Sequence, residues 1–155
     1  MTVSSGNAQR VSIFLLLALS AIPGASAGLY VVDVDLPPQN PVHNVVVTYT
    51  LPAGVIYKTG SFSASGAPTS VPQEEVSMPN DGSVPVTIIW TFGEVYNSGD
   101  LDIEIHFDGI VADVEGNQDG VQLPPGTVSY TYDGGPGAKT GRSQPTNIVE
   151  PDLTI

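Results

Sequence analysis

The sequence predicts an all-β protein, an antiparallel immunoglobulin-like β-sandwich of seven to nine short strands. Apolar and polar residues alternate with a period of two in many short segments after residue 28. The 17 glycines and 14 prolines are dispersed, as many turns require, and no helical period occurs after residue 28. Strands with one apolar face need a second sheet to cover that face, and a sandwich supplies it.

The composition limits the classes of function. A chain of 155 residues fits one domain, and the absence of cysteine excludes disulfides, thiolate metal sites and thiol nucleophiles. Four basic residues against 16 acidic ones give a formal net charge of -12. Such a chain repels nucleic-acid phosphate and anionic lipid, so we expect neither as a partner.

Residues 1–27 are predicted to be a secretory signal peptide. Arg10 is followed by an apolar run, residues 11–22, that is shorter than the ~20 residues of a membrane span. Ala25-Ser26-Ala27 is a small-x-small site of the kind that signal peptidase cleaves. Cleavage after Ala27 leaves a mature chain without a membrane span. The alternative is an uncleaved membrane anchor, because Arg10 is the only base in this segment.

The strand pattern is clearest in residues 84–92. Val86, Ile88 and Trp90 share one face, which we expect in the core between two sheets, and the other face is also fairly apolar, as in a central strand. Asp108-Gly109 is a hairpin signal. Residues 66–82, 116–126 and 133–145 are predicted loops. The predicted strands are residues 29–36, 44–50, 55–57, 61–64, 84–92, 101–107, 110–114, 128–132 and 146–155, the last interrupted at Pro151.

Four stretches resemble a known family, the tandem β-sandwich repeats of unknown function in archaeal and bacterial surface proteins and isopeptide-type fimbrial proteins. Tyr49 departs from that family's pattern, which usually has an acidic residue there. The stretches are NVVVTYTLPAGVIY at 44–57, WTFGEV at 90–95, VADVEGNQDG at 111–120 and VEPDLTI at 149–155.

The resemblance implies a repeat module over residues 28–150 and an inter-repeat lead-in strand over residues 151–155. It implies a structural or adhesive module of a secreted cell-surface protein, part of a stalk, filament or envelope layer, and no enzyme. Its partners would be neighbouring repeat modules or identical subunits. The alternative is an extracellular binding module that recognises a glycan or a protein through its long loops.

Calcium is the one metal that the sequence indicates, and no other cofactor is expected. Asp113, Glu115, Asn117 and Asp119 place oxygen ligands at alternate positions of a glycine-bearing loop. The pattern is not an EF-hand, because the twelfth position counted from Glu115 is Gly126. The alternative is a solvated acidic turn.

The other candidate chemistry has a simpler explanation. An isopeptide bond, known in some fimbrial relatives, needs a buried lysine, but Lys58 lies beside a turn and Lys139 in a glycine-rich loop, so Asn147 has no evident donor. His43 and His106 are the only histidines, and no nucleophile elbow or HExxH motif is present. His106, Asp102 and Glu104 are expected to point outward. An aromatic sugar-binding platform of Trp90, Tyr57 and Phe92 is the alternative to a core position for Trp90.

Overall fold

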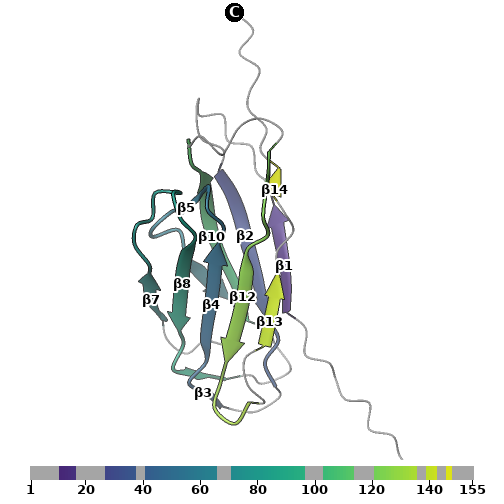
Figure 1. Cartoon of the computed structure of the whole chain (residues 1–155). Coiled ribbons are helices and arrows are strands. Elements are labelled where there is room, and N and C mark those ends of the chain that lie inside the picture. The colour runs from purple at the N-terminus through teal and green to yellow at the C-terminus, as the bar shows by residue number, and fades with distance from the viewer. Residues whose placement is uncertain are drawn as a thin grey trace, which may run out of the picture.

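The computed structural model describes residues 11–16, 27–37, 41–65, 71–96, 103–113, 121–135, 139–142 and 146–147. All regular structure in these ranges is β-strand, and every pairing between strands is antiparallel. Two five-stranded sheets face each other, as Figure 1 shows. The prediction of an antiparallel immunoglobulin-like sandwich is therefore confirmed.

The first sheet is built around β10 (Ile103–Val111), its longest strand. One side of β10 pairs with β2 (Ala27–Val34), which in turn pairs with β1 (Val11–Leu16). The other side of β10 pairs with two short strands in succession, β6 (Ser63–Ser65) and β5 (Val55–Tyr57).

The second sheet has the order β13-β12-β4-β8-β7. Its central strand is β4 (Val46–Leu51), which pairs with β8 (Val86–Thr91) on one side and with β12 (Thr127–Thr131) on the other. Its edges are β7 (Gln73–Val76) and β13 (Lys139–Arg142). Two small ladders complete the described strands: β3 (Val42–His43) with β9 (Glu94–Val95), and β11 (Gln122–Leu123) with β14 (Thr146–Asn147).

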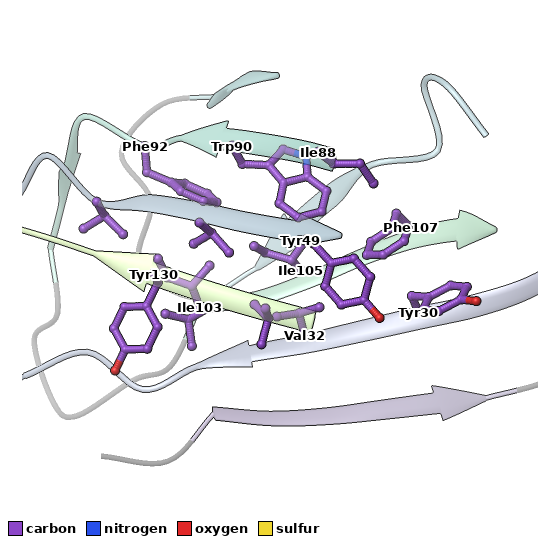
Figure 2. Close-up of a cluster of buried hydrophobic side chains, with 14 of the residues drawn as sticks. Tyr30, Val32, Tyr49, Ile88, Trp90, Phe92, Ile103, Ile105, Phe107 and Tyr130 are labelled. Atoms are coloured by element: carbon purple, nitrogen blue, oxygen red, sulfur yellow. The ribbon is translucent and has the colours of Figure 1, made fainter. Parts of the chain in front are cut away.

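The core lies between the sheets and is rich in aromatic rings (Figure 2). Phe107 of β10 stacks on Tyr30 with ring centroids 5.0 Å apart, and its ring also approaches Tyr49, Tyr57 and Trp90 at 5.3–5.7 Å. Such stacked and edge-on pairs add to the stabilisation that burial of apolar area provides. The predicted core positions are confirmed, because Val86, Ile88 and Trp90 are fully buried.

All three predicted loops contain strands, and residues 116–126 include the two-residue β11 (Gln122–Leu123). Residues 66–82 include β7, and residues 133–145 include β13. Both are edge strands with polar sequences, QEEV and KTGR, so neither carries the apolar alternation that marks a half-buried strand. Their position is set by backbone pairing with β8 and β12, which is a long-range contact.

The predicted hairpin at Asp108-Gly109 is wrong, because β10 continues through both residues. Gly109 lies opposite Tyr57 on one side and Gly28 on the other. A Cβ atom at Gly109 would lie 2.5 Å from Cε2 of Tyr30. The glycine is therefore needed for the close approach of the Tyr30 ring and does not mark a turn.

Both ends of the chain bear on the predicted domain boundaries. Val11–Leu16, inside the predicted signal peptide, forms β1 on the edge of β2, and β2 begins at Ala27, the residue before the predicted cleavage point. This pairing describes the uncut chain, so cleavage stays a prediction. No helix in the described ranges could span a membrane.

Of the predicted strand at 146–155, Thr146–Asn147 forms β14, and residues 148–155, with the lead-in, lie outside the described residues.

Candidate functional site

A polar clamp joins the two sheets near the β5 and β7 edges. Glu74 of β7 accepts hydrogen bonds at Oε2 from the Tyr57 hydroxyl at 2.6 Å and from Trp90 Nε1 at 3.2 Å. Tyr57 belongs to β5 of the first sheet, whereas Glu74 and Trp90 belong to the second. Both aromatic side chains are fully buried, so the carboxylate accepts from two donors that lie in the core.

Neighbouring residues fix the geometry of the clamp. The Asn80 side chain accepts from the Tyr57 backbone N–H and donates to the Tyr57 carbonyl, both at 2.8 Å, as a neighbouring strand would. The Phe62 ring stacks on Trp90 at 5.5 Å. Burial, followed by the hydrogen bond to Glu74, raises the pKa of the Tyr57 phenol above its ordinary value. The phenol therefore stays protonated and donates a hydrogen bond to the carboxylate.

The clamp was not predicted from the sequence, because Glu74 fell within the predicted loop 66–82. The only local sign is that Glu74 and Val76 lie two residues apart and both turn toward the interior, between exposed Gln73, Glu75 and Ser77. An acidic residue at an inward position does not look apolar, so the alternation is hidden.

A second group of ionisable residues lies on the outer face of the first sheet. Asp33 of β2 is opposite Glu104 of β10, and His106 Nε2 contacts Glu104 Oε1. Burial and then the charge of Glu104 raise the pKa of Asp33, while His106 lowers it. His106 and Glu104 are each more than a third exposed, which confirms their predicted outward orientation. Asp102 lies outside the described residues.

The remaining ion pairs are at the surface. His43 Nδ1 lies 3.2 Å from Glu94 Oε1, and Lys58 Nζ lies 2.9 Å from Asp108 Oδ2. The Lys58 side chain is 54% exposed, so its amine is not in the buried setting that an isopeptide bond needs. Exposed pairs of this kind contribute little to stability.

The predicted calcium loop is described only at its start. Asp113 is exposed just beyond the end of β10, and Glu115, Asn117 and Asp119 lie outside the described residues. Within the described ranges, no group of three or more His, Asp or Glu side chains is placed to hold a metal ion. Calcium binding by the 113–119 loop therefore stays a prediction.

If this loop binds calcium, adding the ion at millimolar concentration should raise the melting temperature, since a ligand that binds only the folded state stabilises it. The Asp119→Ala variant should lose that gain. Asp81→Ala, which removes an exposed carboxylate outside the loop, is the matched control and should keep it. Calorimetry that shows neither a calcium-dependent heat nor a melting shift would leave the loop as a solvated acidic turn.

The sugar-platform alternative is wrong for the three aromatic residues that suggested it. Trp90, Tyr57 and Phe92 are each at most 1% exposed. Their faces pack inside the sandwich, where no glycan can reach them.

Comparisons with known proteins show the fold. No protein family model and no curated protein matches the chain. Among solved structures, the collagen-binding subdomain of the Enterococcus faecalis surface protein ACE is similar with a TM-score of 0.50 and 6% identity, over 89% of this chain and 96% of that one. A backbone pilin of Streptococcus pyogenes is similar with a TM-score of 0.52 and 12% identity, over 90% of this chain and 36% of the pilin.

Proposed function

We propose that this chain is a structural or adhesive module of a secreted cell-surface protein, acting in a stalk, filament or envelope layer. The observation that carries the proposal is the sandwich itself, which shares its fold with a domain of a bacterial surface protein and with part of a pilin. On this proposal its partners are neighbouring modules or identical subunits, and residues 28–150 form the module.

The physical features suit such a role. The polar clamp of Tyr57, Glu74 and Trp90 ties one sheet to the other without a covalent bond, so it resists shear between them. The net charge of -12 keeps the surface solvated. Three ion pairs of the described residues, His43 with Glu94, Lys58 with Asp108 and His106 with Glu104, lie at the surface.

A second candidate is an extracellular binding module that recognises a glycan or a protein through its loops. One observation favours it: the connection between β7 and β8 exposes two apolar side chains, Met78 and Val84. Exposed apolar residues that gather on one part of a surface indicate contact with a partner. Binding of a glycan or matrix protein that is lost in Met78→Ser would favour this candidate over the structural one.

Secretion with cleavage after Ala27 is the first test of the proposal. In an export-competent bacterial host, N-terminal sequencing of the exported protein should give Gly28 as the first residue. The Ala27→Gln variant should block processing because signal peptidase needs a small residue there, whereas Ser26→Gln, at the unrestricted middle position, should be processed normally. An exported chain that still begins at Met1 would contradict the predicted signal peptide.

A further inference from the structure

One side of the sandwich is closed by β1. This strand pairs with β2 along six residues, from Val11 opposite Val34 to Leu16 opposite Leu29. It also lies against β13 of the facing sheet, as Figure 1 shows at the side of the molecule where the purple and yellow strands meet. With β1 in place, Val32 and Val34 of β2 are fully buried.

Cleavage after Ala27 removes β1 and leaves almost all of β2. In the mature chain, residues 29–34 of β2, the six that pair with β1, would form the edge of the first sheet without that partner strand. Long open edges of this kind recruit another strand. The residues of β2 that face the core, Tyr30, Val32 and Val34, are apolar, and Asp33 lies on the solvent face.

The pattern of the strand that fits this edge can be taken from β1. Its residues opposite the buried Val34, Val32 and Tyr30 are Val11, Ile13 and Leu15, which are apolar at every second position. Residues 149–155 have the same spacing, since Val149, Pro151, Leu153 and Ile155 alternate with Glu150, Asp152 and Thr154. Proline has no N–H to donate, and it is tolerated in a strand at an edge.

A chain cannot place its own tail on this edge in the orientation of β1. A strand antiparallel to β2 must enter at the Val34 end, where β1 begins. Figure 1 shows β14 at the opposite end of β1, and residues 148–155 come directly after β14. Eight extended residues span at most about 29 Å, and β2 is about 26 Å long. Residues 148–155 would all be needed to reach the entry point, so residues 149–155 of the same chain cannot pair antiparallel with β2.

We infer that in the processed chain residues 149–155 of a second copy take the place of β1 on the β2 edge, antiparallel to it. This inference rests on the proposed secretion and cleavage. It is a form of β-strand addition, in which backbone hydrogen bonds and alternate apolar side chains hold the donated strand. In this head-to-tail contact each copy gives one strand and receives one, so the copies assemble into rings or open filaments.

The charges give the contact a distinctive salt dependence. Glu150 and Asp152 of the donated strand fall on the solvent face, where β2 and β10 carry Asp33 and Glu104. Like charges on neighbouring strands oppose pairing. Added salt screens that repulsion, so association should strengthen as the sodium chloride concentration rises, the reverse of a contact held by ion pairs.

Light scattering and analytical ultracentrifugation test the inference on two forms of the full chain. The unprocessed chain, made without export, keeps β1 and should stay monomeric. The exported chain that begins at Gly28 should form assemblies whose mass rises with protein concentration. Leu153→Lys should abolish assembly, and the matched control Thr154→Lys, on the solvent face, should retain it. A synthetic peptide of residues 149–155 should compete with assembly.

Three results would overturn the inference. The chain that begins at Gly28 could be stable and stay monomeric at every concentration. It would then need no donated strand, or it would insert its own residues 149–155 parallel to β2. Assembly that survives deletion of residues 152–155 uses another surface. The processed chain could also be unfolded. If a peptide of residues 11–16 restores its folding and a peptide of residues 149–155 does not, β1 is an integral strand of the domain. An exported chain that begins at Met1 would instead contradict the proposed secretion, and N-terminal sequencing separates that case from the others.

Discussion

Replacing Trp90 with alanine should lower the free energy of unfolding by about 3–5 kcal/mol. Trp90 is the largest fully buried side chain, on β8, which lies between β4 and β7 in the second sheet. The change removes the indole from between Phe62 and Phe107 and leaves a cavity in a close-packed core. It also takes one of the two donors from Glu74. Urea or guanidinium denaturation, followed by circular dichroism, measures the loss.

Two control variants separate the contributions at Trp90. Trp90→Phe keeps most of the buried ring but loses the Nε1 donor, so its loss should be smaller than that of Trp90→Ala. Tyr96→Ala removes an aromatic side chain that is 46% exposed, and it should change stability by no more than about 0.5 kcal/mol. A Trp90→Ala loss no greater than that of Tyr96→Ala would contradict the core position of Trp90.

The sandwich and its core were predictable because half-buried strands carry their burial in their sequence. In β10, Ile103, Ile105 and Phe107 face the core, while Glu104 and His106 face solvent, as the alternation predicts. The same holds for β2 and β8. The period of two is a local property, and the apolar face of each strand leaves only one side on which the second sheet can pack.

The sequence did not reveal the edge strands or the clamp, because both depend on partners far away in the chain. The position of β7 follows from pairing with β8, and Glu74 becomes structural only when Tyr57 and Trp90, 17 and 16 residues away, lie on either side of it. Gly109 shows the opposite failure. Asp-Gly favours a turn locally, but the ring of Tyr30 requires a residue without a Cβ in the middle of a strand.

The candidate sites were predicted less well than the fold for the same reason. The alternate oxygen-bearing side chains of residues 113–119 form a local sequence pattern. Whether they can bind a metal together depends on the conformation of the loop. The aromatic platform was inferred from residue type alone, although burial decides whether a ring meets a ligand or packs in the core. For Trp90 the strand pattern predicted a core position, whereas the residue type suggested a sugar-binding surface, and the core position is confirmed.

Gly82 is the position where the smallest substitution should have a large effect. It is a buried residue in the segment that connects β7 to β8, and its φ of 83° lies in the left-handed region that residues with a Cβ disfavour. Its carbonyl accepts from the Gly54 N–H at 2.8 Å, and the Gly54 carbonyl accepts from the Ala112 N–H at 2.8 Å. Three connecting segments therefore meet backbone to backbone, and a Cβ at Gly82 would lie 2.3 Å from the Cβ of Ala112.

Gly82→Ala should therefore lower the free energy of unfolding by about 2–5 kcal/mol. The left-handed backbone conformation costs about 1–2 kcal/mol, and overpacking costs about 1–3 kcal/mol. Gly60→Ala is the matched control, because Gly60 has a φ of 79° but nothing within 4 Å of the added Cβ, so it should show the conformational cost alone. Adding Ala112→Gly to Gly82→Ala removes the opposing methyl group and should recover the overpacking part, as a double-mutant cycle by chemical denaturation would measure. Equal losses in Gly82→Ala and Gly60→Ala, with no recovery in the double variant, would mean that the three segments do not meet as closely as the hydrogen bonds through Gly54 place them.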